Sequence, residues 1–299
     1  MNIALAITHK DQYIGVYWAK WVAALGGIEE AKVFVGQTLG GSKAFNEITL
    51  ALSKVCDLKT FGIGGGSQGY PMGSNTAFRE VMDRACEDGK PVAWLEVDCV
   101  PVKKNWYKQI KEEYYRHKKP FCGPFVGGPA HMNGTGIYPP NWRKLTTISS
   151  CPPKMPWDCH IGKDVIKQMH RSPLWQHGPR FIGFSDYTLG LIKPKTVMFH
   201  PCKNLSLIRT LNERFGKVIP ETEFKMVHRY YLCTCLTTPP IMNSNIKFLD
   251  LGLHAGSKWG ITSTNDIDEQ CEISRLTYMG GVTEIGKEDY QKYLKQIAA

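Results

Sequence analysis

The feature that most constrains the fold is an alternation of short apolar runs with helical segments along the first 128 residues. The apolar runs, each a candidate strand, occupy residues 2–7, 32–36, 57–63, 91–97 and 120–128. Between them, apolar residues recur at helical intervals over 13–27, 44–55, 76–89 and 104–116. This alternation predicts an α/β fold in which helices flank a mostly parallel central sheet.

Small residues mark the ends of these helical segments. Gly26 and Gly27 close the first segment and Gly89 closes the third. Ser74 or Asn75 is the expected N-cap of the third segment, because short polar side chains bond the first free N–H groups of a helix.

The alternation weakens beyond residue 210. Residues 235–266 are rich in turn formers, and 287–299 predict a C-terminal helix. We therefore expect an α/β domain over 1–210 and a C-terminal extension over 211–299.

Composition narrows the class of protein. With 42% hydrophobic and 21% charged residues, and no run of about 18 apolar residues, we expect a soluble protein without a membrane span. The N-terminus lacks the features of a secretory signal. Ten cysteines then indicate reduced thiols in a cytoplasm. Cys233 and Cys235 lack the second ligand pair of a typical structural zinc site.

The net charge of +10 favours polyanionic partners, namely a nucleoside diphosphate, nucleic acid or an anionic membrane surface. A solvated basic surface explains the same charge.

Two acids follow the apolar run in "PVAWLEVDCVP", residues 91–101. Side chains at i and i+2 of an extended chain share a side, so Glu96 and Asp98 can face one cation. Ligands of open α/β sheets bind beyond the carboxyl ends of strands, and carboxylates are ligands for Mg²⁺ or Mn²⁺. The alternative is that both are surface acids paired with Lys103 or Lys104.

The segment "WLEVDCVPVKKNW", residues 94–106, resembles the acidic DxD-type motif of GT-A fold glycosyltransferases. That resemblance implies a GT-A-like domain in which Glu96 and Asp98 hold a divalent metal against the diphosphate of a nucleotide sugar. Glu replaces the usual first Asp, which makes Asp98 the safer ligand.

Other segments resemble the same family in the same order. "AITHKDQ" resembles the first-strand loop that contacts the nucleotide, which implies Thr8 and His9 as binders. "GYPMGSNTAFREVMDRA" implies Asn75 and Arg79 near the donor. "GPAHMNGTGIYPPNW" resembles the turn that shapes the sugar and acceptor pocket, which implies Asn133 and Gly134 there. Each segment alone is equally an ordinary turn or helix cap.

The resemblance also implies an acid that addresses the acceptor or the sugar. Asp158 in "MPWDCHIGKDVIKQM" precedes a helical pattern, where an Asp is most often an N-cap. Asp186 in "FSDYTLGL" is a competing match. We favour Asp158.

A histidine completes the implied metal site. "TVMFHPCKNLSLI" ends a strand-like run in His200 and places Lys203 three residues later, as a third ligand and a diphosphate contact. "LHAGSKWG" offers a rival pair, His254 and Lys258. The segments "LWQHGPRF" and "FHPCKNLSLI" are also similar to glycosyltransferase-like proteins of bacteriophages.

The resemblance therefore implies a metal-dependent hexosyl- or pentosyltransferase with Mn²⁺ or Mg²⁺ and a UDP-sugar donor, and with residues 211–299 as a candidate acceptor-binding region. A hydroxymethylated pyrimidine in phage DNA is one acceptor to test, which would place the protein in a host cytoplasm and make DNA a partner. The alternatives are a nucleotidyltransferase and a non-catalytic nucleic-acid-binding protein.

Overall fold

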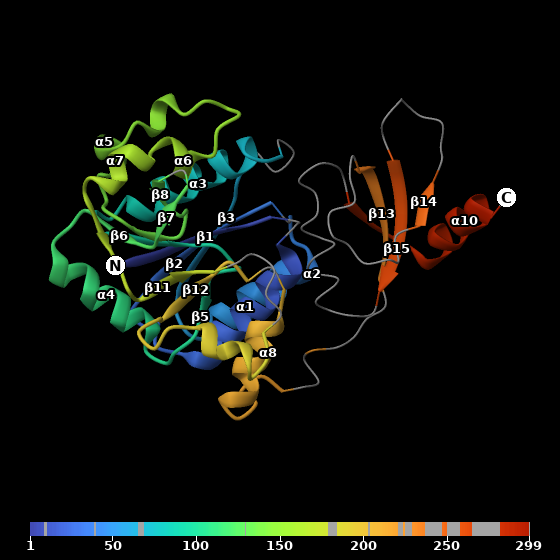
Figure 1. Ribbon diagram of the computed structural model, residues 1–299, viewed down its shortest axis with the longest axis horizontal. Coiled ribbons are helices and arrows are strands. Elements are labelled where there is room, and N and C mark those ends of the chain that lie inside the picture. Colours follow the sequence, from blue (N-terminus) through green and yellow to red (C-terminus); the bar gives the residue numbers. More distant parts are fainter. Residues whose placement is uncertain are drawn as a thin grey trace. The chain divides into compact units, whose positions relative to one another are not determined.

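A computed structural model describes residues 1–8, 11–38, 40–64, 69–128, 130–178, 184–202, 204–220, 224, 229–236, 247–249, 258–264 and 282–298. The chain divides into two compact units, Met1–Ile219 and Pro220–Ala299. Figure 1 labels the elements of each unit.

The first unit is built on a seven-stranded sheet with the order β10-β6-β9-β4-β1-β2-β3. Neighbouring strands run parallel except at β9, which is antiparallel to β4 and β6. The prediction of an α/β fold with a mostly parallel central sheet is confirmed. The strands are β1 (Asn2–Ile7), β2 (Lys32–Gln37), β3 (Asp57–Gly62), β4 (Val92–Leu95), β6 (Phe121–Gly123), β9 (Gly136–Tyr138) and β10 (Met169–Arg171).

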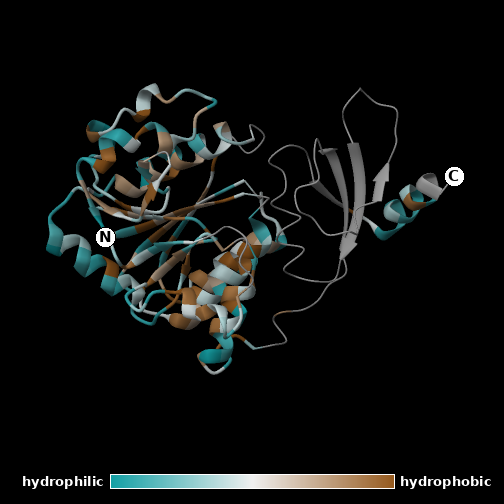
Figure 2. Cartoon of the chain, viewed as in Figure 1, coloured by the Kyte–Doolittle hydropathy of each residue, from teal (hydrophilic) through white to brown (hydrophobic). Residues whose placement is uncertain are grey.

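Helices flank this sheet, and Figure 1 shows α1 and α8 on one side of it and α3 and α7 on the other. Apolar residues gather on the central strands and on the helix sides that face them (Figure 2). The helices are α1 (Gln12–Leu25), α2 (Lys43–Leu52), α3 (Met72–Cys86), α4 (Trp106–His117), α5 (Trp142–Leu145), α6 (Trp157–His160), α7 (Gly162–Ile166) and α8 (Ser206–Arg214), with 3₁₀ turns η1 (Ile148–Ser150) and η2 (Thr188–Leu191).

Two smaller sheets complete the unit. Residues 120–128 do not form the single strand expected, because Pro124 has no N–H to continue a ladder. The chain instead leaves β6, and β7 (Phe125–Gly127) pairs with β8 (Ala130–Met132). A three-stranded sheet has the order β11-β12-β5, formed by β11 (Trp175–His177), β12 (Met198–His200) and β5 (Val100–Pro101).

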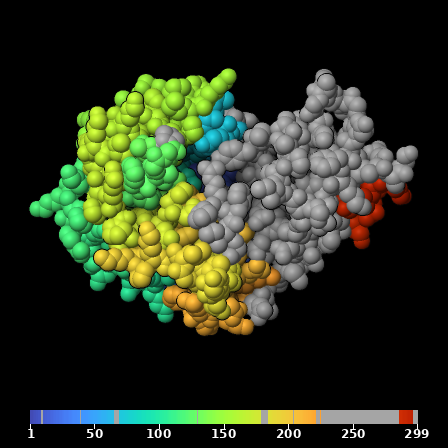
Figure 3. Space-filling view, in the orientation of Figure 1, coloured from blue at the N-terminus to red at the C-terminus, as the bar shows by residue number. Residues whose placement is uncertain are grey.

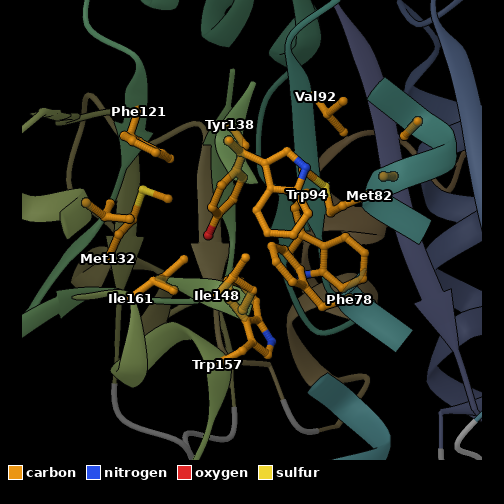
Figure 4. Close-up of a cluster of buried hydrophobic side chains, with 14 of the residues drawn as sticks. Phe78, Met82, Val92, Trp94, Phe121, Met132, Tyr138, Ile148, Trp157 and Ile161 are labelled. Carbon is orange, nitrogen blue, oxygen red and sulfur yellow. The ribbon is translucent and has the colours of Figure 1, made fainter. Parts of the chain in front are cut away.

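The hydrophobic core on one side of the sheet is rich in aromatic residues (Figure 4). Phe78 of α3 stacks on Trp157 of α6, with ring centres 3.4 Å apart and planes 9° from parallel. Phe78 also meets Trp94 of β4 edge to face at 5.0 Å. Aromatic pairs of this kind stabilise beyond the area that they bury. The core therefore fixes α6 close to the end of β4.

The start of α3 differs from the prediction. The helix begins at Met72, so Ser74 and Asn75 lie inside its first turn and neither is the N-cap. Ser74 Oγ donates to the carbonyl of Pro71 at 2.8 Å, and the Asn75 amide bonds the segment before α6. Both side chains are thus already engaged elsewhere.

The second unit contains an antiparallel sheet with the order β14-β15-β13-β16. The strands within the turn-rich residues 235–266, Lys247–Leu249 and Lys258–Thr264, were not predicted, whereas the C-terminal helix is confirmed. Among the described helices of the chain, none combines the length and hydropathy needed to cross a bilayer. The elements are β13 (Arg229–Leu236), β14 (Lys247–Leu249), β15 (Lys258–Thr264), β16 (Val282–Ile285) and α10 (Lys287–Ala298).

Candidate active site

The carboxyl end of β4 lies at a switch point of the sheet. β1 pairs in parallel with β2 on one side and with β4 on the other, so the strand order reverses there. Open α/β sheets bind ligands outside the strand ends at such a point. Thr8 follows β1 and Glu96 follows β4, which places both residues at this edge.

A turn, not an extended strand, brings the two acids after β4 together. The strand ends at Leu95, and the N–H of Cys99 donates to the carbonyl of Glu96 at 2.8 Å. The expected strand over 91–97 is therefore too long, and side-chain alternation does not place the acids. The indole of Trp18 donates to the carbonyl of Cys99 at 2.8 Å, which anchors the turn to α1.

His200 reaches the same point from the other side. β12 runs antiparallel to β5, with Phe199 opposite Val100, and the N–H of Cys202 donates to the carbonyl of Asp98 at 2.7 Å. His200 Nε2 lies 3.2 Å from Glu96 Oε2 and 3.4 Å from Asp98 Oδ1. The structure thus brings together Glu96, Asp98 and His200, three residues that the sequence suggested as metal ligands.

The electrostatics of this cluster favour a positive charge. Burial lowers the pKa of His200, but the carboxylates of Asp98 and Glu96 outweigh that effect, and the net pKa is raised. Asp98 is fully buried, whereas the Glu96 side chain is 41% exposed. One donor atom from each residue lies within 4.8 Å of the other two. Two carboxylates and an imidazole form a donor set that suits Mn²⁺ or Mg²⁺.

His177 lies next to His200 on the neighbouring strand. It ends β11, directly opposite His200 in the parallel pairing with β12. The Nδ1 atoms of the two rings lie 3.4 Å apart. A ligating histidine commonly bonds a further group through its second nitrogen, which fixes the ring orientation. His177 has this contact with His200, and the sequence predictions did not include it.

Asp158 lies beside this cluster. It occupies the first turn of α6, where its Oδ1 accepts from the N–H of Cys159 at 2.9 Å and its Oδ2 from the N–H of Gly134 at 3.3 Å. Burial raises the pKa of Asp158, the nearby His131 lowers it and Glu96 raises it further, and the net pKa is raised. Glu96 acts on this pKa because its carboxyl group and that of Asp158 both lie beside Gly134.

Gly134 separates the two carboxyl groups. A Cβ atom at this position would lie 3.0 Å from Glu96 Oε1, 3.3 Å from Trp157 Cζ2 and 3.8 Å from Asp158 Oδ2. A side chain at this position would therefore be crowded by these neighbours, and the absence of a Cβ atom lets the two carboxyl groups lie close to the backbone here. The preceding residue, Asn133, has a buried Oδ1 without a hydrogen-bond partner among the described residues. A buried acceptor of this kind suits a donor group on a ligand.

His131 is a second group that the sequence reading missed. Its Nε2 lies 3.6 Å from Asp158 Oδ2, and His131, Asp158 and Cys159 offer donor atoms within 4.8 Å of one another. His131 lies two residues before Asn133 in "GPAHMNGTG", and the resemblance implied only Asn133 and Gly134 there. Only the packing of α6 against β8 reveals the contact.

Asn75 lies in the first turns of α3, with both ends of its amide bonded within the protein. It is buried, its Nδ2 donates to the carbonyl of Met155 at 2.9 Å and its Oδ1 accepts from the N–H of Trp157 at 2.9 Å. The amide thus holds the segment that leads into Asp158. Arg79 is half-buried, and its Nε donates to the carbonyl of Asn75 at 3.2 Å.

The other residues named from the sequence differ in where they lie. Thr8 Oγ1 donates to Asp11 Oδ2 at 2.7 Å, at the edge that holds Glu96. Asp186 is exposed and lies 3.4 Å from the Nε of Arg214. His9, Lys203 and His254 lie outside the described residues, as does the side chain of Lys258.

No model of a known protein family matches this chain, and no curated protein sequence matches it. Solved structures give weak similarities. The galactosyltransferase LgtC with donor and acceptor sugar analogues is 11% identical over 74% of this chain and 98% of LgtC, with a TM-score of 0.45. Mouse xyloside xylosyltransferase 1, in its apo form, is 9% identical over 67% of this chain and 96% of that protein, with a TM-score of 0.42.

The S. aureus TarS 1–349 structure is 13% identical, with a TM-score of 0.38. The match covers 55% of this chain and 55% of the TarS chain, so this chain spans only about half of that structure. At these identities and TM-scores the similarities do not assign this chain to a family or to an activity.

Proposed function

We propose that this chain is a metal-dependent glycosyltransferase that moves a sugar from a nucleoside diphosphate donor, expected to be a UDP-sugar, to a hydroxyl group. The observation that carries the proposal is the convergence of Glu96, Asp98 and His200 at the switch point of the sheet, with Asp158 beside them across Gly134. A metal site alone would fit many proteins. The neighbouring carboxyl group with a raised pKa supplies the proton acceptor that transfer to a hydroxyl requires.

Glu96, Asp98 and His200 would hold Mn²⁺ or Mg²⁺. When bound, the ion neutralises charge on the diphosphate and on the departing nucleotide. Thr8 lies at the same edge, and its proposed role is to meet the nucleotide. The proposed role of Asn133 is to accept a hydrogen bond from a sugar hydroxyl, which its buried Oδ1 without a partner among the described residues supports.

In a direct displacement, the acceptor oxygen bonds to the anomeric carbon as the bond from that carbon to the diphosphate breaks. The nucleoside diphosphate leaves with the bonding electrons, and the acceptor proton passes to the Asp158 carboxylate. Its raised pKa makes Asp158 a stronger base than an ordinary carboxylate once it is ionised.

A panel of nucleotide sugars tests this proposal. We expect one donor to raise Tm and to be hydrolysed slowly in the presence of Mn²⁺. Asp98→Asn should lower the hydrolysis rate on the order of 10²-fold or more, because it removes a charged ligand of the ion. Asp57→Asn is the control, since Asp57 in β3 is half-exposed and its ion-pair partner among the described residues is Lys59, at 2.8 Å.

The enzyme class is wrong if no donor responds, or if Asp98→Asn and Asp57→Asn respond alike. The acceptor is a separate question. The +10 charge supports a polyanion, and label transfer from the donor to hydroxymethylated DNA, compared with unmodified DNA, tests that acceptor. Absence of transfer there removes DNA as the acceptor and leaves the donor chemistry standing.

A further inference from the structure

A second group of metal-binding side chains lies on α4 and β10, away from the candidate active site. Glu113, His117 and His170 each offer one donor atom, and these three atoms lie within 4.8 Å of one another. β10 is the edge strand of the seven-stranded sheet, separated from β4 by β6 and β9. Three strand spacings of about 4.8 Å place the two strands roughly 14 Å apart.

The secondary structure aligns these residues. Glu113 and His117 are four residues apart on α4, so both project from one side of the helix. His170 is the middle residue of β10 and lies opposite Cys122 of β6. His170 Nε2 lies 3.1 Å from Glu113 Oε1. Figure 3 shows the green segment that contains α4 along the outer edge of the first unit.

The carboxylate of Glu113 is held by a hydrogen bond to its second oxygen, as carboxylates that bind metal ions usually are. Glu113 is only 6% exposed, and its second oxygen, Oε2, accepts a hydrogen bond from the hydroxyl of Ser172. Ser172 Oγ in turn accepts from the N–H of Leu174 at 3.1 Å. In metal sites, hydrogen-bond partners of this kind orient the residues that bind the ion. They leave Oε1 directed at His170.

The two imidazoles lie against one another. The rings of His117 and His170 are stacked, with centres 3.5 Å apart and planes 11° from parallel, so the exposed ring of His117 must turn out of the stack before both imidazoles face one ion. Bonds of 2.0–2.1 Å in a tetrahedral zinc site place neighbouring ligand atoms about 3.3 Å apart. The 3.1 Å between His170 and Glu113 is close to the same value. His117 is exposed, so an ion can enter from solvent.

We propose that Glu113, His117 and His170 bind one Zn²⁺ ion, which ties the last turn of α4 to the edge strand β10. Two imidazoles and one carboxylate favour zinc over Mg²⁺, which prefers oxygen ligands alone. Water fills the fourth position. The site shares no residue with Glu96, Asp98 and His200, and it does not depend on the function proposed above.

Titration calorimetry with Zn²⁺ and absorption of bound Co²⁺ test this site in the full chain. We expect His117→Ala to bind one Zn²⁺ equivalent fewer than wild type and to lose one set of tetrahedral Co²⁺ bands. Arg116→Ala, also exposed on α4, is the matched control and should bind as wild type does. Ser172→Ala should keep the equivalent with about 10–100-fold weaker affinity.

Glu96→Gln separates the two sites, because it removes only a half-exposed ligand of the first one. In that background we expect Zn²⁺ to raise Tm, and the rise to disappear when His117→Ala is added. The proposal is overturned if His117→Ala keeps the full zinc stoichiometry and Co²⁺ spectrum of wild type. Glu113 and His170 would then be a hydrogen-bonded pair only.

Discussion

Two clusters of the first unit combine carboxylates and imidazoles in opposite proportions. They are the cluster at β4, formed by Glu96, Asp98 and His200, and the cluster at β10, formed by Glu113, His117 and His170. The first has two carboxylates and one imidazole, and the second has one carboxylate and two imidazoles. The first lies at the switch point of the sheet beside another acid, Asp158, whereas the second lies at an edge strand and is braced by Ser172. The two clusters thus offer similar donor atoms in different surroundings. What distinguishes the first cluster is the chemistry around it.

Among the variants that test the difference between the two clusters, Asp158→Asn should have the largest effect. We expect sugar transfer to fall about 10²–10⁴-fold, which is the usual contribution of a general base. Binding of Mn²⁺ should change little, since Asp158 is not one of the three ligands. Initial rates with the donor found in the panel, together with Mn²⁺ titration of both proteins, measure the two effects.

The competing acid gives the control for this experiment. Asp186 is exposed and lies beside Arg214, so Asp186→Asn should transfer sugar nearly as fast as wild type. If Asp186→Asn loses as much activity as Asp158→Asn, our assignment of the base is wrong. If both variants lose only a little activity, Asp158 is not needed for sugar transfer. The carboxyl group beside the first cluster would then not set it apart from the second cluster.

A smaller effect is expected from Gly134→Ala. The added methyl group would lie 3.0 Å from Glu96 Oε1 and 3.3 Å from the Trp157 ring, so Glu96 or α6 must shift. The neighbours must move by a few tenths of an ångström, less than the roughly 1 Å displacement that costs on the order of 10²-fold in rate, so we expect a loss of about tenfold or less. Gly127→Ala is the matched control, because a Cβ atom there meets nothing within 4 Å. Steady-state rates and Mn²⁺ affinity of both variants provide the comparison, and equal rates would show that Gly134 is not needed to space the acids.

The fold was largely predictable because its strands and helices follow one another along the chain. The run at 2–7 is β1, and the helical spacing over 13–27 corresponds to α1. Such patterns depend on nearby residues only. The strands β14 and β15 were missed, because short runs within the turn-rich residues 235–266 carry little periodicity.

The candidate sites were predictable in part for the same reason. Glu96 and Asp98 are two residues apart, and His200 was placed with them through the resemblance and not through spacing. The contact of Gly134 with Glu96 and Asp158 depends on how α6 packs, which no local pattern reveals. Likewise Glu113 and His117 are visible as an i, i+4 pair, but only the sheet brings His170 to them.

The smallest predicted effect concerns the pH dependence of stability in the metal-free protein. The folded-state pKa values of His200 and Asp158 are both raised above their ordinary values of 6.5 and 3.8. Each group therefore contributes stability that is complete below its ordinary pKa and is lost as the pH rises through the raised value. We expect the Tm of the metal-free protein to fall as the pH rises through the region above 6.5, because His200 then loses its proton between two carboxylates. His200→Gln should flatten this part of the curve, and saturating Mn²⁺ should remove it from wild type, since the ion replaces the proton as the positive charge. A slope that persists in His200→Gln would contradict this explanation and would assign the pH dependence to groups outside the first cluster.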